Sequence, residues 1–172
     1  MGNGFCSGKE EDEAGLLVLS ERLSRKELII KVQDHTAASV VRALDRLERK
    51  MGSPAFRATF KSITVDNGSE FADVEGMERS CRRKGARTKV YYCHPYSSWE
   101  RGTNENTNGL IRRWFPKGTD FSKVSVQEIQ KVADWLNAYP REILGFLSAD
   151  AVFTAATSSL VRNYFNFFEK IC

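Results

Sequence analysis

Two acidic residues, Asp66 and Glu105, stand where metal ligands are expected. Asp66 follows the apolar stretch 63–65 and precedes an Asn-Gly turn, and open α/β sheets gather their functional sites at the carboxyl ends of strands. Glu105 falls in the first turn of a predicted helix. Carboxylate oxygens are ligands that Mg²⁺ and Mn²⁺ prefer, and two such ions can activate a nucleophile and stabilise the leaving oxygen in phosphoryl transfer. The pair therefore predicts metal-dependent chemistry at a phosphate ester.

Each acid also has a simpler structural interpretation. Asp-Asn-Gly is a strong turn former without any metal, and an acid in the first turn of a helix complements the helix dipole. Glu100, in the loop beside Trp99, is a rival for the second carboxylate, but a ligand anchored on a helix is held more firmly. We expect Glu70 to cap or charge the start of a helix rather than to bind metal.

Basic residues are concentrated between Arg79 and Lys117. This segment holds ten basic and two acidic residues, so it carries +8 while the rest of the chain carries −4. A polyanion is the natural partner of such a segment because neutralising phosphates releases counterions, and a solvated basic helix face is the alternative. The candidate phosphate-binding residues are Arg82, Arg83, Lys84, Arg101, Asn108, Arg112 and Arg113.

The totals describe one soluble domain. With 172 residues the chain is long enough for a single domain with its own core and short for two. Hydrophobic residues make up 41% and charged residues 28%, which excludes a disordered composition. No apolar run approaches the roughly 20 residues that cross a bilayer, so we expect a cytoplasmic protein without a membrane partner. Four cysteines without a C-x-x-C pair argue against a zinc site or a disulfide framework.

The elements that precede Asp66 alternate between strand and helix. The stretches 16–19 and 28–32 are predicted to form an antiparallel hairpin. Apolar residues then recur every three or four positions over 37–51, which predicts an amphipathic helix that ends at Gly52. The sequence Ser-Pro breaks this helix, and the stretch 62–66 returns to strand.

A second helix is predicted to follow Asp66 and to end near Gly85, with the basic run on its outer side. The stretch 88–93 reads as a buried strand near the sheet centre, and a loop leads from it to a helix from Thr103. The pattern Ser-Val-Gln-Glu from Ser125 is a capping box that opens a further helix. The aromatic C-terminal stretch is expected to be helical. This order predicts an α/β fold in which helices cover a mixed sheet.

Three stretches resemble one known family. They are "ITVDNGSEF", "KVYYCHPYSSWERGTNENTNGLIRRWFPKGTDF" and "LNAYPREILGF", and they are similar to the catalytic core of IS30-type insertion-sequence transposases, in the DDE transposase and retroviral-integrase group. The resemblance runs from about residue 16 to 153. It implies an RNase H-like fold, with a mixed five-stranded sheet flanked by helices. It also implies two bound Mg²⁺ or Mn²⁺ ions, transposon and target DNA as partners, and action as a homo-oligomer.

The resemblance implies roles for the two acids. The second acid of the family motif lands on Asp66, and the third, inside "TNENTN", lands on Glu105, with Asn108 three positions on. Between Asp66 and Glu105 lie 38 residues, and between Asp66 and Glu100 lie 33. The shorter spacing is closer to that of the family, but the position in the motif favours Glu105.

The sequence departs from the family at its front. The family's first Asp belongs to an opening strand, and the nearest position here holds Asn3, so that strand is interpreted as truncated or degenerate. The family's N-terminal helix-turn-helix domain is also expected to be absent, which leaves residues 1–172 as the catalytic core. The main hypothesis is a DDE transposase that cuts DNA strands and transfers 3′ ends. An inactive remnant that only binds DNA is the alternative, and a nuclease of the same fold is a third possibility.

Overall fold

The computed structural model describes residues 2–6, 14–93 and 102–157, with the backbone alone described for 2–6 and 102–105. Within these ranges five strands form one mixed sheet in the order β3-β2-β1-β4-β5. The strands are β1 Gly2–Cys6, β2 Gly15–Ser20, β3 Glu27–Val32, β4 Ser62–Val65 and β5 Lys89–Tyr92. The mixed α/β class predicted from the sequence is thereby confirmed.

The sheet has an antiparallel half, β3-β2-β1, and a parallel half, β1-β4-β5. The predicted hairpin is present, because β2 and β3 pair antiparallel from Gly15↔Val32 to Ser20↔Glu27. β1 pairs antiparallel with β2 and parallel with β4, and β4 pairs parallel with β5. The stretch interpreted as a truncated or degenerate first strand is therefore the central strand. Its sequence, Gly-Asn-Gly-Phe-Cys, has little β propensity, and neighbours on both sides supply its pairing.

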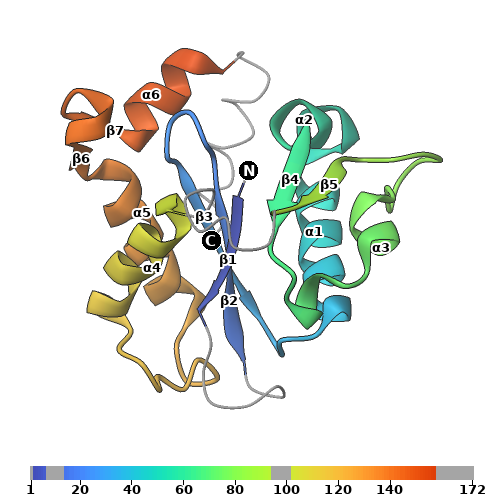
Figure 1. The fold of residues 1–172 in the computed structure, drawn as a ribbon, viewed down its shortest axis with the longest axis horizontal. Helices are drawn as coiled ribbons and strands as arrows, with labels where there is room; N and C mark the ends of the chain where they lie inside the picture. Colours follow the sequence, from blue (N-terminus) through green and yellow to red (C-terminus); the bar gives the residue numbers. More distant parts are fainter. Residues whose placement is uncertain (1, 7–13, 94–101, 158–172) are drawn as a thin grey trace.

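Helices cover both faces of the sheet (Figure 1). One face carries α1 Ala37–Met51, α2 Ser53–Thr59, the short 3₁₀ turn η1 Ser69–Phe71 and α3 Val74–Glu78. The other face carries α4 Gly102–Trp114 and α5 Val126–Ala138. Side chains of β2 alternate between the two cores, with Leu17 and Leu19 on the α1 side and Leu16 and Val18 on the α4–α5 side.

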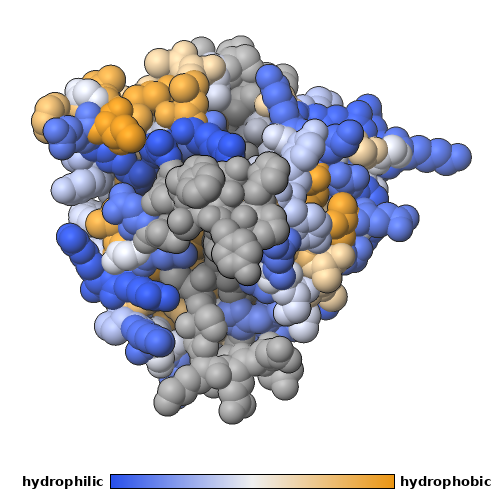
Figure 2. Space-filling model, viewed as in Figure 1, coloured by the Kyte–Doolittle hydropathy of each residue, from blue (hydrophilic) through white to orange (hydrophobic). Residues whose placement is uncertain are grey.

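A smaller substructure follows α5. It consists of β6 Pro140–Arg141, the 3₁₀ turn η3 Glu142–Leu144, β7 Leu147–Ser148 and α6 Ala149–Ala156. The exposed side chains of Ile143, Phe146 and Leu147 lie here, and hydrophobic surface gathers over the same elements at the upper left of Figure 2. The described part of the chain contains no helix that is both long and apolar enough to span a bilayer.

The predicted helix boundaries hold where local capping decides them. α1 ends at Met51, and Gly52 follows with φ of 79°. The capping box before α5 is complete, because Ser125 accepts from the Glu128 backbone N–H and Glu128 accepts from that of Ser125. α1 is interrupted before Ser53-Pro54 as predicted, but the sequence did not predict the short helix α2 that follows. Pro54 lies in the first turn of α2, where a missing N–H costs nothing. The predicted C-terminal helix is present only as α6 within the described residues.

The prediction of a long second helix up to Gly85 is wrong. α3 ends at Glu78, Arg79 is extended and forms a bridge with Ala86, and the chain between them is a loop. The cause is Arg87, whose guanidinium donates to the backbone oxygens of Gly76 and Met77. A continuing helix would need both of these carbonyls for its own N–H groups.

The predicted position of the strand 88–93 is also wrong. β5 lies at the edge of the sheet, where β4 is its one neighbour among the described strands. Tyr91 and Tyr92 are accordingly 52% and 42% exposed. A run of large residues without alternation is typical of a buried central strand in a sequence, but here α3 is the described helix that packs against it.

Candidate active site

Asp66 lies at the carboxyl end of β4, as the sequence predicts. It is half-buried, and its Oδ1 accepts from the backbone N–H of Gly68 at 3.2 Å. Directly beside it, the backbone N–H of Cys93 donates to the oxygen of Val65 at 2.8 Å, so β5 ends at the same edge. The Asn-Gly turn therefore shapes the backbone around Asp66 and turns the chain from the sheet edge towards η1.

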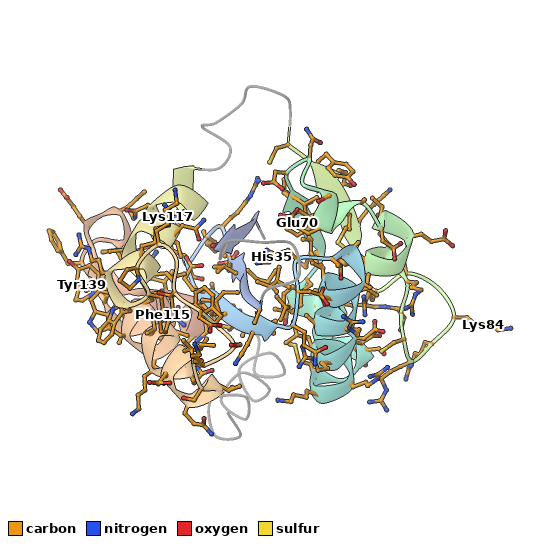
Figure 3. The ribbon with its side chains drawn as sticks, turned by 90° about the horizontal axis from the view of Figure 1, so that it is seen from below. His35, Glu70, Lys84, Phe115, Lys117 and Tyr139 are labelled. Carbon is orange, nitrogen blue, oxygen red and sulfur yellow. The ribbon has the colours of Figure 1, made fainter. Side chains whose placement is uncertain are left out.

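Glu70 places a second carboxylate at this turn. It lies in η1, and a methyl group added at Gly68 would collide with the Glu70 carboxylate. Figure 3 shows Glu70 beside the end of the sheet, on the same side as α1. Glu70 thus charges the start of a helical turn, although this turn is a 3₁₀ turn and not the long helix expected. Its position raises the local negative charge near Asp66.

α4 carries Glu105 and packs against β1, the strand next to β4. Thr107 and Ile111 point into the core, Asn108 is half-buried, and Arg112 and Arg113 are exposed. The polar face predicted for this helix is therefore its accessible side. The side chain of Glu105 and all of Glu100 and Arg101 lie outside the described residues. The structure thus packs α4 against the strand that adjoins β4.

The register of β1 against β4 identifies the position level with Asp66. Gly2 pairs with Thr64 in this parallel ladder, so the same register carried on by two residues sets Gly4 beside Asp66. Asn3 is level with Val65, one position earlier. Neighbouring residues of parallel strands that are level share a face of the sheet. Continued in this register, the ladder sets Gly4 on the same face of the sheet as Asp66 and Asn3 on the opposite face.

A buried carboxylate that the sequence analysis did not identify connects the sheet to α4. Glu27, at the start of β3, is 2% exposed and accepts from Ser20 Oγ at 2.5 Å and from Thr107 Oγ1 at 2.7 Å. Arg141 Nη1 lies 3.9 Å from its Oε1. Burial raises the pKa of Glu27 to about 7, against the two hydroxyl donors and the Arg141 charge, which lower it.

The signal for this carboxylate was weak in the sequence. Glu27 directly precedes an apolar run, where it reads as the end of a polar connection. Its partners Thr107 and Arg141 lie 80 and 114 positions further along. Thr107 belongs to the same "TNENTN" stretch as Glu105, so Glu27 holds the turn of α4 that follows the candidate metal ligand.

The structure divides the predicted basic segment between the two sides of the sheet. Arg82, Arg83 and Lys84 lie on the turn after α3, and Arg112 and Arg113 lie at the end of α4. Lys84 and Lys117 accordingly stand at opposite sides of the molecule in Figure 3. Arg87 was counted with the surface charges, but it is 1% exposed and paired with Asp45 Oδ1 at 2.5 Å. The segment of charge +8 is therefore not one surface.

The residues at the Asp66 edge have the right chemistry for a divalent ion. Asp66 offers carboxylate oxygens from a strand end, and Glu105 would add a second carboxylate from α4. Such oxygen donors suit Mg²⁺ or Mn²⁺. Within the described ranges no group of three His, Cys, Asp or Glu side chains forms a metal site, so the donor set depends on Glu105.

Comparison with known proteins relates the chain to insertion-sequence transposases. It is 40% identical over 137 residues to the transposase of the element IS1086 from Cupriavidus metallidurans, which covers 80% of this chain and 38% of the relative. It is 38% identical over 142 residues to the transposase InsI of IS30A from Escherichia coli, which covers 83% of this chain and 34% of the relative. No protein-family model matches the chain. The predicted resemblance to IS30-type transposases is confirmed, and the chain spans less than half the length of these relatives.

A solved structure supports the fold. A chain in the cryo-electron-microscopy structure of the simian T-cell lymphotropic virus intasome, in complex with the PP2A regulatory subunit B56γ, matches with a TM-score of 0.64. The match covers 92% of this chain and 54% of that chain at 15% identity. At this identity the likeness concerns the fold, which is shared over nearly the whole chain.

Proposed function

We propose that this chain is the catalytic module of a DDE transposase with an RNase H-like fold, which cleaves DNA strands and joins 3′ ends to target DNA. One observation carries the proposal: Asp66 ends the strand that adjoins β1, and the helix with the "TNENTN" motif packs on β1. The relation to insertion-sequence transposases supports the same reaction class. The order of strands and the helices on both faces support the RNase H-like assignment.

The proposed reaction needs a metal site and a phosphate-binding surface. Asp66 and Glu105 would hold two Mg²⁺ or Mn²⁺ ions, which when bound activate the attacking hydroxyl and stabilise the leaving oxygen. The protein's own contribution is to hold these carboxylates on rigid elements and to orient the DNA. Asn108, Arg112 and Arg113, on the accessible side of α4, would contact DNA phosphates near the scissile bond. Further copies of the chain would assemble on the DNA.

The alternative is a remnant that binds DNA without cleaving it. The observation that favours it is Gly4, which stands level with Asp66 in the β1–β4 register and has no side chain to offer an ion. Two carboxylates in place of three would bind divalent ions more weakly, since each carboxylate contributes charge and oxygen ligands.

Strand-nicking assays on supercoiled DNA with Mn²⁺ test the proposal. We expect the wild-type chain to nick slowly, Asp66→Asn to be inactive, and Gly4→Asp to raise the rate because it restores a third carboxylate. Glu105→Gln should abolish nicking, whereas Glu100→Gln should leave the nicking rate unchanged.

Asn3→Asp is the matched control for Gly4→Asp, since it adds the same charge one position away. It should not raise the rate. If neither the wild-type chain nor Gly4→Asp nicks DNA, while both still bind it, the transposase proposal is wrong and the remnant remains.

A further inference from the structure

The exposed face of α1 carries positive charge alone after its first turn. The two acidic residues of the helix, Asp45 and Glu48, are 8% and 0% exposed and face inward. Surface helices usually mix both signs of charge, because Glu and Lys four positions apart stabilise each other. The exposed charged side chains of α1 are Arg42, Arg46, Arg49 and Lys50.

Arg87 explains why both acids of α1 point inward. Its Nη1 lies 2.5 Å from Asp45 Oδ1 and 3.4 Å from Glu48 Oε2, and its side chain is fully buried. The acids of α1 thus neutralise a buried cation from the segment before β5. Outside, Arg42 pairs with Asp34 at 3.4 Å, and Arg49 lies 4.0 Å from the Asp45 Oδ2 that Arg87 leaves on the outer side. The remaining described cations of the helix outnumber these acids.

These arginines line a groove and not a flat helix surface. A groove of about 700 Å³ runs between α1, the end of β3 and the turn before α5. Its charged lining residues among those described are Lys31, Arg42, Arg46, Arg49 and Asp45. Asp45 is the one carboxylate in this described lining and is already paired with Arg87, so the described lining is net positive.

A second recess continues the positive charge past the end of α1. It measures about 320 Å³ and is lined by Arg49, which also lines the first groove, together with Lys50, Arg82 and Arg83. Arg82 Nη1 donates to the backbone oxygen of Arg49 at 3.2 Å, which ties the basic turn to the helix end. The α1 basic surface therefore consists of Arg42, Arg46, Arg49, Lys50, Arg82 and Arg83.

We propose that the α1 basic surface binds the phosphate backbone of a second DNA segment, separate from the segment at the candidate active site. From Arg42 to Arg49 the helix axis rises about 10 Å, a length over which duplex DNA carries about six phosphate charges. The surface lies on the opposite side of the sheet from Asn108 and Arg112. The choice of DNA among polyanions rests on the proposed function.

DNA binding by the 172-residue chain, measured without divalent metal over a series of salt concentrations, tests this inference. We expect Arg46→Gln/Arg49→Gln to lower the affinity for duplex DNA about tenfold or more at low salt. The slope of log K against log salt should become shallower by about two, since each lost phosphate contact removes about 0.9. The thermal unfolding midpoint should not change, because both side chains are exposed.

Arg22→Gln/Lys61→Gln is the matched control. It removes the same two charges from exposed positions outside the α1 basic surface and should keep the wild-type slope. Equal losses in both pairs, or wild-type binding by the α1 pair, would overturn the inference; the second result is what an acidic protein partner would give. Because binding is measured without divalent metal, a failure of catalysis is read separately. If the wild-type chain binds no DNA at all, the proposed function itself fails.

Discussion

At the scale of single residues, burial changes the protonation of the ionisable side chain of Glu27. Glu27 is a carboxylate inside the protein, held by hydroxyl groups from β2 and α4. The neutral, protonated form of such a group is favoured, because burial disfavours charge more than the donors and Arg141 favour it. Folding and protonation of Glu27 are therefore linked.

Glu27 should make stability depend on pH between about 4.5 and 7. Below pH 4.5, its ordinary pKa, the carboxyl is protonated in both states and costs nothing. As pH rises towards its folded pKa of about 7, the unfolded state ionises first, so the folded state loses stability, and above that value the full loss is present. The loss is on the order of 3 kcal/mol, from about 1.4 kcal/mol per unit of pKa.

Urea denaturation of the wild type and of Glu27→Gln at pH 5 and pH 8 measures this effect. The glutamine variant cannot ionise, so its free energy of unfolding should fall less between the two pH values. Other titrating groups are common to both proteins and cancel in the comparison. Parallel pH profiles would show that Glu27 ionises as readily inside the protein as in the unfolded chain.

At the scale of elements, the sequence predicted those helices and strands that depend on residues near one another in the chain. The hairpin of β2 and β3 joins strands that are consecutive in the chain, and the end of α1 and the capping box of α5 depend on residues a few positions apart. The sequence predicted all three. The short α3 depends on Arg87, whose partner Asp45 lies 42 positions away. The edge position of β5 depends on which strands pair with it, and these are distant in the sequence. The position of Asp66 was predictable for the same reason, since a strand and its turn are adjacent, whereas the register that selects Gly4 is a contact between strands.

We expect the Arg87 side chain to stabilise the packing of α1, α3 and the segment before β5. Although burial raises the pKa of Glu48, hydrogen bonds from Ser80, the Cys81 backbone and Ser53 bring it down to about 2, so this acid stays charged inside the protein. Arg87→Met would leave it and Asp45 without their buried cation. We expect the free energy of unfolding to fall by about 3–5 kcal/mol, the usual cost of breaking a buried ion pair.

Arg79→Met is the comparison for Arg87→Met. Arg79 also approaches Asp45, at 3.7 Å, but its side chain is 52% exposed. Water already screens such a pair, so its loss should cost about 1 kcal/mol or less. Denaturant titration of both variants measures the two losses in free energy of unfolding. Similar losses would mean that Arg87 does not stabilise this region more than Arg79 does.

At the scale of the whole molecule, the sheet separates positive charge that the sequence runs together. The sequence has a net charge of +4 and one basic segment. Neither the net charge nor the position in the sequence shows on which side of the sheet a residue lies. The α4 arginines and the α1 basic surface lie on opposite layers, with the sheet between them (Figure 1). We therefore expect the two layers to contact different DNA segments.

A single chain should therefore bridge two duplexes. A fluorescent duplex should be captured by the protein on beads that carry a second duplex. Either Arg46→Gln/Arg49→Gln or Arg112→Gln/Arg113→Gln should reduce this capture strongly and still bind one duplex. Because the two pairs are far apart and share no partner, their effects on binding free energy should add when combined. The alternative explanation is that two associated chains bridge the duplexes. In that case a dimer of either single-pair variant would still have two copies of its remaining basic surface and would capture the second duplex. Capture by the single-pair variants therefore distinguishes the two explanations.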